Sequence, residues 1–249
     1  MSHRTKHVVV VLLVVLLLGG LVQLGRVLAQ GGLLGAAPKQ SYEEWLNEFD
    51  VHDKFRAELE RLRGEQHSRR DLMVAYTFLY YQYGKIGELE PLVKRKERGD
   101  SWAKVFADYL NRHDGFVPRT YDTKYLESLT SAANISVDDI MIADRLSFVT
   151  GEPMDSMLSA KLESGKKWKD IAAELGIVNG SSALPRVEIT AAQLEKFSTT
   201  TFPQEKVAEA FVLSQKVGLK PQEVVSQMKA GRTETDIMAK AWAGRYSSY

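Results

Sequence analysis

The sequence predicts an all-α protein with an N-terminal signal or anchor helix, a long amphipathic helix and three tandem units of short helices. Two observations lead to this prediction. Apolar residues recur at helical spacing, and no alternating pattern of useful length predicts a β-strand. The stretch Asp139–Ile177 also has two further copies, at Asp71–Asn111 and Lys206–Gly244. A period of this length is typical of helical-repeat proteins.

Equivalent positions in the copies can be named. A shift of 67 residues places Leu146 on Leu213 and Gly151 on Gly218, and Gly84 takes the place of Gly151 in the first copy. A glycine directly after a periodic apolar segment is a common helix end, because the residue there often adopts the left-handed conformation. Each unit is therefore predicted to be a helix closed by glycine, a second helix and a short third helix.

Two tryptophans occupy one position of the repeat. The spacing glycine, two residues, tryptophan, two residues, aliphatic residue starts at Gly99 and again at Gly165, with Trp102 and Trp168 as the tryptophans. Glu234 stands at this position in the third copy, and terminal repeats are often atypical. We expect both tryptophans to be buried, each against the first helix of its own unit.

Residues 1–29 have the features of an export leader. A short basic head precedes Val8–Leu18, which is eleven consecutive valines and leucines, and Ala29 ends a segment that suits signal peptidase. The alternative is an uncleaved anchor, because residues 8–24 are just long enough to cross a bilayer. Both alternatives predict an extracytoplasmic protein that is secreted or associated with the cell envelope.

The rest of the chain divides into linkers and helical segments. Residues 30–40 are a linker of small residues, and residues 41–111 combine a long amphipathic helix, Tyr42–Arg63, with the first unit. Residues 112–177 and 178–249 hold the second and third units. These two ranges each begin with an irregular linker and a short helix, at Lys124–Ala132 and Thr190–Phe197.

Four tyrosines crowd one predicted helix of the first unit, between Tyr76 and Tyr83, with Tyr80 and Tyr81 between them. Four such rings within eight residues cannot all face one core, so we expect some to be exposed. Exposed tyrosines can bind a sugar or a peptide, because the ring offers apolar area and the hydroxyl a polar group. The alternative is that they are core residues.

Composition excludes several classes of chemistry. The chain has no cysteine, which rules out disulfides, thiolate zinc sites and cysteine nucleophiles. The formal net charge is +1, and without residues 1–29 there are 30 basic and 32 acidic residues. A nearly neutral body gives no electrostatic reason to bind nucleic acid, so we expect no nucleic-acid partner.

Catalytic, cofactor-binding and metal-binding residues are not predicted. Phosphate-binding, dinucleotide-binding, serine-hydrolase and zinc-protease motifs are absent from the sequence. Glu48 and His52 would share a helix face, but no third metal ligand is indicated. His113 and Asp114 lie in a linker beside Gly115, where a base could act, although a turn is the simpler interpretation.

The segment Gly165–Ile177, GKKWKDIAAELGI, is similar to the opening of a helix-turn-helix unit. A proline and turn residues follow where a recognition helix should begin. The same segment, together with the leader and the tandem plan, resembles poorly characterised exported helical-repeat proteins of Gram-positive bacteria over about residues 70–245. The resemblance implies an exported helical protein and brings no functional residues.

Three functions are consistent with these observations. The first is a non-catalytic module that binds an envelope protein, the cell wall or the membrane, because stacked repeats offer extended surfaces. The first alternative is an exported hydrolase-like enzyme with a site of scattered carboxylates and tyrosines. The second alternative is a membrane-anchored helix-turn-helix regulator that binds DNA. Repetition without a catalytic motif favours the first function.

Overall fold

A computed structural model describes residues 41–132 and 135–249, so the expectations for the leader and for the linker 30–40 lie outside the described residues. This part of the chain contains thirteen α-helices, one short 3-10 helix and no β-strand, which confirms the all-α prediction. Within these two ranges, no helix is both long and apolar enough to cross a membrane.

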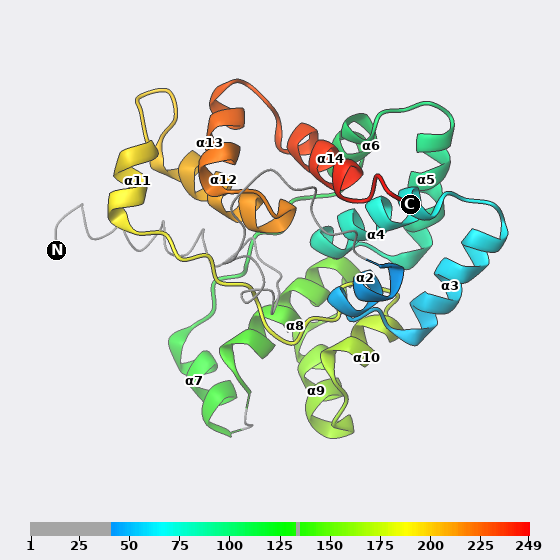
Figure 1. Cartoon of the computed structure of the whole chain (residues 1–249). Coiled ribbons are helices and arrows are strands. Elements are labelled where there is room, and N and C mark those ends of the chain that lie inside the picture. The colour runs from blue at the N-terminus through cyan, green and yellow to red at the C-terminus, as the bar shows by residue number, and fades with distance from the viewer. Residues whose placement is uncertain (1–40, 133–134) are drawn as a thin grey trace.

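Three successive helix triplets make up most of the molecule (Figure 1). The first helix of each triplet has 14 residues: α4 (Arg69–Gln82), α8 (Val137–Thr150) and α12 (Gln204–Val217). That the triplets are copies of one repeat stays a prediction. The second and third helices of the triplets are α5 (Leu89–Glu97) and α6 (Trp102–Leu110), α9 (Met154–Ser164) and α10 (Trp168–Glu174), and α13 (Pro221–Lys229) and α14 (Glu234–Arg245). The short 3-10 helix η1 (Ile86–Glu88) precedes α5.

The prediction of one long amphipathic helix at Tyr42–Arg63 is wrong. The segment forms two helices, α2 (Tyr42–Glu48) and α3 (Asp53–Gly64). The chain turns at Asp50, whose φ of 41° is left-handed. His52 then begins α3, since its Nδ1 accepts a hydrogen bond from the backbone N–H of Lys54 at 3.1 Å. Buried side chains continue through the turn, which is why the apolar spacing did not reveal the break.

The two linker helices lie close to their predicted positions, as α7 (Thr123–Ala132) and α11 (Ala191–Phe197). Glycine ends the first helix of two triplets, since Gly151 and Gly218 have φ values of 77° and 71°. In the first triplet Tyr83 takes this position with φ 58°, so the glycine end expected at residue 84 is displaced by one residue.

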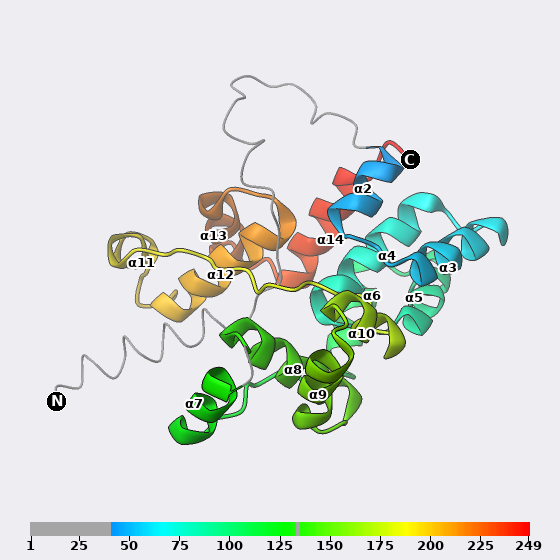
Figure 2. The same cartoon turned by 90° about the horizontal axis from the view of Figure 1, so that it is seen from below.

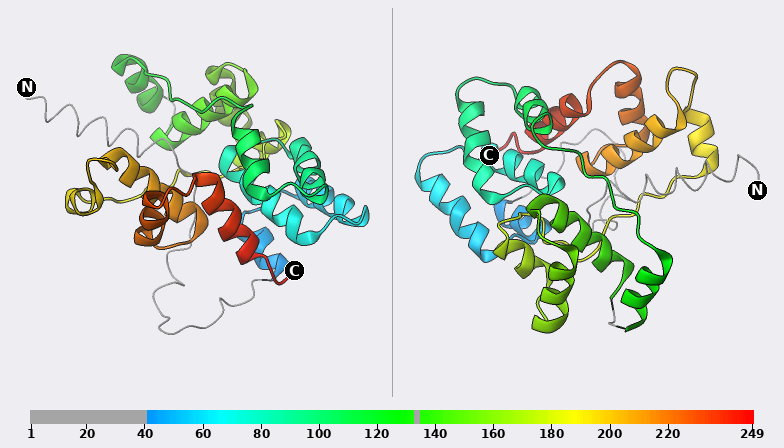
Figure 3. Two further views of the ribbon diagram at one scale, coloured as in Figure 1. Left: turned by 90° about the horizontal axis from the view of Figure 1, so that it is seen from above. Right: turned by 180° about the vertical axis from the view of Figure 1, so that it is seen from behind.

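The first and third triplets share one hydrophobic core, although the second triplet separates them in the sequence. Helix α14 packs against both α6 and α4 (Figure 3). The rings of Trp242 and Tyr81 stack at 5.6 Å. Helices α8, α9 and α10 lie together (Figure 2) and form a second core. This core also includes Tyr83. The molecule therefore has two cores rather than three separate units.

The segment that follows α10 joins the two cores. The backbone N–H of Ile86 donates to the carbonyl of Gly176 at 2.8 Å, and the N–H of Val178 donates to that of Gly84 at 3.0 Å. These two hydrogen bonds form an isolated antiparallel bridge beside the end of α4. The second triplet is thus held to the first by backbone hydrogen bonds.

The structure confirms that both repeat tryptophans are buried, with 5% of Trp102 and 1% of Trp168 exposed. The indole N–H of Trp168 donates to Asp139 at 2.6 Å, and Asp139 lies on α8, the first helix of the same triplet. Trp102 stacks on Phe106 of its own helix. The expected contact between Trp102 and α4 stays a prediction.

Candidate functional site

A cavity of about 370 Å³ lies between the linker that precedes α7 and the C-terminal half of α8. Its volume falls within the range of small-ligand pockets. Both polar side chains and aromatic or aliphatic side chains line it. The lining residues are Phe116, Val117, Arg119, Asp144, Ser147, Phe148, Gly151, Glu152 and Pro153.

The polar part of the lining is built on an ion pair in which the Asp144 carboxylate is buried and the Arg119 side chain is half exposed. Asp144, which is 1% exposed, accepts hydrogen bonds from Nε of Arg119 at 2.5 Å and from its backbone N–H at 3.1 Å. The hydroxyl of Tyr121 donates to the same carboxylate at 2.8 Å. The hydrogen bond to Asp144 also raises the pKa of Arg119, so the guanidinium stays charged. These bonds hold the linker against α8.

The mouth of the cavity is apolar. Val117 is 76% exposed and Phe148 is 41% exposed, and the ring of Phe116 lies edge-on to that of Phe148 at 5.4 Å. Large hydrophobic side chains that are exposed together mark interaction sites. Across the described residues, the exposed large hydrophobic side chains all fall within residues 112–177, and they are Val117, Val137, Phe148 and Leu162.

Arg145 packs against Phe116 at the mouth of the cavity and pairs with no carboxylate of the described residues. The guanidinium of Arg145 lies 4.6 Å from the Phe116 ring and 5.0 Å from the Tyr83 ring, and it donates to the carbonyl of Gln82 at 3.2 Å. No salt bridge joins Arg145 to another described residue. Burial accordingly lowers its pKa. Cation–π contacts of this kind fix the position of Phe116 and connect the cavity to the end of α4.

The polar groups of the cavity are already engaged with one another. The hydroxyl of Ser147 donates to the carbonyl of Glu152 at 2.5 Å and accepts from Arg119 at 2.6 Å. In the described part of the chain, no histidine is hydrogen-bonded to Ser147, so the geometry offers no base to activate this hydroxyl. The arrangement suits the binding of an apolar group.

The tyrosine cluster is not a surface site. Tyr76, Tyr80, Tyr81 and Tyr83 are 0%, 6%, 9% and 4% exposed, so the expectation that some are exposed is wrong. The reason is that α4 lies between both cores: Tyr83 belongs to the second core and the other three to the first. Burial raises the pKa of Tyr83 to about 12.

His113 does meet a carboxylate, but not the neighbouring Asp114. Its Nε2 lies 3.0 Å from Glu88, which also accepts a hydrogen bond from the Tyr109 hydroxyl at 2.9 Å. The imidazole stacks on the Tyr109 ring at 3.9 Å. Sequence reasoning missed Glu88 because η1 and the linker are brought together only by folding. The cluster ties the start of the linker to η1.

Glu48 and His52 do not share a helix face, and that expectation is wrong because α2 ends between them. Arg245 donates to Glu48 at 2.7 Å from the C-terminal helix. His52 instead caps α3, with its Nε2 3.6 Å from Asp170. The two side chains therefore serve different contacts.

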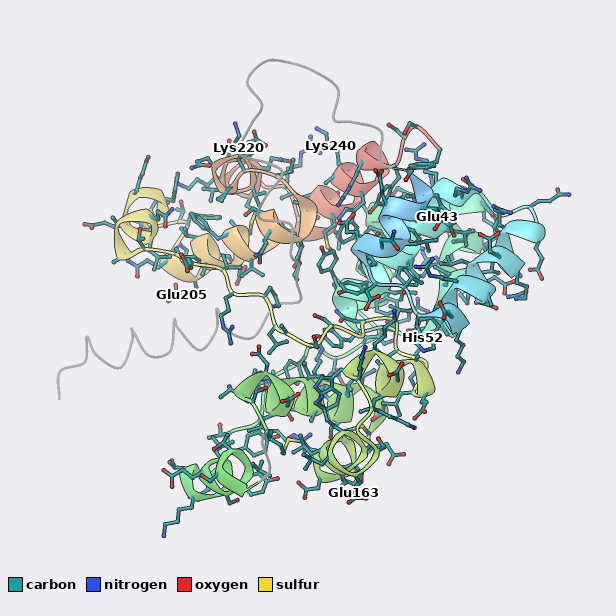
Figure 4. The ribbon with its side chains drawn as sticks, turned by 60° about the horizontal axis from the view of Figure 1, so that its bottom comes forward. Glu43, His52, Glu163, Glu205, Lys220 and Lys240 are labelled. Atoms are coloured by element: carbon teal, nitrogen blue, oxygen red, sulfur yellow. The ribbon has the colours of Figure 1, made fainter. Side chains whose placement is uncertain are left out.

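No recognition helix follows α10 at the position that a helix-turn-helix unit requires. The chain is non-helical from residue 175 to residue 190, and α11 begins only at Ala191. Charged side chains of both signs project from separate parts of the surface, as Glu163, Glu205, Lys220 and Lys240 illustrate (Figure 4).

In comparisons with known proteins, no family model, curated protein or solved structure matches the chain.

Proposed function

We propose that the chain is a non-catalytic binding module of the cell envelope, either secreted or held at the membrane by its N-terminal segment. Its partner is an envelope protein that inserts an apolar side chain into the cavity beside Val117 and Phe148. The observation that carries the proposal is that two of the exposed large hydrophobic side chains, Val117 and Phe148, line this cavity. The resemblance to exported helical-repeat proteins agrees with it and stays a prediction.

The balance of polar and apolar groups supports a protein partner. Arg119 and Asp144 pair with each other, so a ligand need not supply a charge. Covering Phe148 and Val117 removes exposed apolar area from water, which favours binding. Protein interfaces have this composition, with an apolar centre and polar groups at the rim. The export leader predicted at residues 1–29 places this surface outside the cytoplasm.

Site-specific photo-crosslinking in intact cells tests the binding surface. A photoreactive phenylalanine analogue replaces Val117 in one strain and Val137 in a control strain, since these valines are 76% and 65% exposed in the same region. We expect one discrete adduct with an envelope protein at position 117 and none at position 137. The further change Phe148→Asp should abolish the adduct at position 117. Equal labelling at both positions, or an adduct with the mass of two copies of the chain, contradicts the proposal.

Cell fractionation with intact mass determination tests the location. A chain that begins at Gln30 in the medium or wall fraction, or a full-length chain in the membrane fraction, supports an envelope module. A full-length chain in the cytosol refutes it and favours the DNA-binding alternative.

A further inference from the structure

The end of α3 and the start of α5 bring together three side chains of the kinds that bind metal ions. Glu65, His67 and Glu90 each place one donor atom so that the three atoms lie within 4.8 Å of one another. The sequence did not indicate this set, because Glu90 lies on another helix. The set lies outside the residues that line the cavity.

The backbone holds the first two side chains in a fixed turn. Gln66, between them, has a left-handed φ of 69°. Its N–H donates to the carbonyl of Arg63 at 3.0 Å, and the N–H of His67 donates to that of Leu62 at 3.3 Å. This pair of hydrogen bonds is the Schellman arrangement that ends α-helices. The positions of Glu65 and His67 are thus set by the end of α3.

The imidazole of His67 is oriented by a fourth residue. Its side chain is 9% exposed, and its Nδ1 lies 2.8 Å from a carboxylate oxygen of Glu97 on α5. Within the described residues, the other ring nitrogen, Nε2, has no hydrogen-bond partner. A carboxylate that holds one imidazole nitrogen while the other faces a metal is the usual arrangement around protein metal ions. Because Glu97 holds Nδ1, Nε2 is the ring nitrogen that remains available to a metal ion.

The charge of the cluster is negative. Three carboxylates converge on one guanidinium, because Arg61 pairs with Glu58 at 2.7 Å, with Glu90 at 3.3 Å and with Glu65. Lys94 also pairs with Glu90 at 2.5 Å. With Glu97, the cluster has four carboxylates and two cationic side chains, Arg61 and Lys94. The net excess of negative charge is one that a divalent cation would neutralise.

Arg61 is the competitor of a metal ion at this site. Its side chain is 45% exposed, so the guanidinium can move into solvent and leave Glu65 and Glu90 free. Exposed ion pairs contribute little to stability, and their loss is easily offset by metal coordination.

We propose that Glu65, His67 and Glu90 bind one divalent transition-metal ion of the Zn²⁺ class, with Glu97 as the positioning residue for His67. Zn²⁺ accepts both imidazole nitrogen and carboxylate oxygen as ligands, and a site with three protein ligands leaves the fourth coordination position open. Mg²⁺ prefers oxygen ligands alone. The bound ion connects α3 to α5 and leaves one coordination position for water or a ligand.

Titration of the full chain with zinc chloride, followed by calorimetry, tests the proposal. We expect one equivalent to bind. Glu65→Gln and Glu90→Gln should each weaken binding by about tenfold or more, and Glu97→Gln by about tenfold. Glu60→Gln is the matched control, since Glu60 also lies on α3 but pairs with Arg63 at 2.9 Å. It should bind Zn²⁺ as the native chain does.

A thermal readout separates a built site from nonspecific binding. Zn²⁺ should raise the melting temperature of the native chain and of Glu60→Gln, but not that of Glu65→Gln or Glu90→Gln. Circular dichroism confirms that each variant is folded. Absence of stoichiometric binding, or equal binding by all variants, overturns the site. Neither result bears on the cavity beside Val117.

Discussion

At the residue scale, Gly84 is a glycine whose small size matters more than its backbone angle, because the side chains of Leu79 and Tyr109 lie very close to it. Tyr83 already takes the left-handed position, and Gly84 follows it. A Cβ atom on Gly84 would lie 2.5 Å from a side-chain carbon of Leu79 and 2.9 Å from the Tyr109 hydroxyl. This residue therefore sets how closely α6 approaches the end of α4.

Gly84→Ala should lower the free energy of unfolding by about 1–3 kcal/mol, because the added methyl group overpacks a buried junction. Gly87→Ala is the control, since no atom lies within 4 Å of its Cβ position. Urea denaturation monitored by tryptophan fluorescence measures both variants. A Gly84→Ala chain as stable as the Gly87→Ala chain would show that the junction can relax.

At the element scale, helix positions could be predicted well where their signals are local. The predicted linker helices at 124–132 and 190–197 match α7 and α11 to within one residue. The break between α2 and α3 could not be predicted, because Phe49 and Val51 are buried within it and continue the apolar spacing. Hydrophobic spacing records which residues are buried, not whether the backbone between them is helical.

The candidate sites were harder to predict, because their residues come from distant segments. The sequence places Phe116 and Val117 in a linker and Phe148 on a helix, without indicating that they meet around a cavity. In the same way, His67 and Glu90 are 23 positions apart in the sequence and on different elements. Such pairs depend on how helices pack, which a single sequence does not specify.

Helix caps with charged and neutral partners should differ in their pH dependence. At the start of α14 the Asp236 carboxylate accepts hydrogen bonds from the Thr233 hydroxyl at 2.7 Å and from the Thr233 N–H at 3.2 Å, and these bonds lower the pKa of Asp236. The Thr233 hydroxyl also accepts from the N–H of Asp236 at 3.1 Å. In α11, Thr190 forms the same box with the neutral Gln193. Only the first cap contains a group that titrates.

Thr233→Ala should cost about 1 kcal/mol of unfolding free energy near neutral pH. The carboxylate of Asp236 has a lowered folded-state pKa, so its contribution is present above the unfolded value and is lost as pH falls through the folded value. The penalty should therefore shrink as the pH falls from about 5 towards about 2. Urea denaturation across this range measures it, and Thr190→Ala should show a constant penalty. A constant penalty in both variants would contradict the assigned role of Asp236.

At the scale of the whole molecule, the order of the triplets in the sequence differs from their association in space. The first and third triplets share a core through α14, while the second triplet has its own. In a linear array each unit would pack only on its sequence neighbours. The second triplet is instead an insertion between two parts of one core, and together with the linker that precedes α7 it carries the cavity and the exposed hydrophobic residues.

Two equivalent leucines can test whether the cores open separately. Leu146 and Leu213 hold matching positions in α8 and α12, and they are 0% and 2% exposed in the second and first core. Leu146→Ala and Leu213→Ala should each lower the free energy of unfolding by about 2–5 kcal/mol. Cooperative units of a protein open with their own free energies, so each loss should appear in the core that contains the change.

Hydrogen exchange followed by mass spectrometry distinguishes the outcomes. Leu146→Ala should speed exchange in α8, α9 and α10 and leave α4, α6 and α14 protected. Leu213→Ala should speed exchange in α12 and α14 and also in α4 and α6, because the first and third triplets open together. If both variants speed exchange in all helices alike, the bridge between Gly84 and Val178 couples the cores into one unit. The helices around the cavity would then open only when the entire described fold opens. If the cores open separately, the binding surface can open while the first core stays folded.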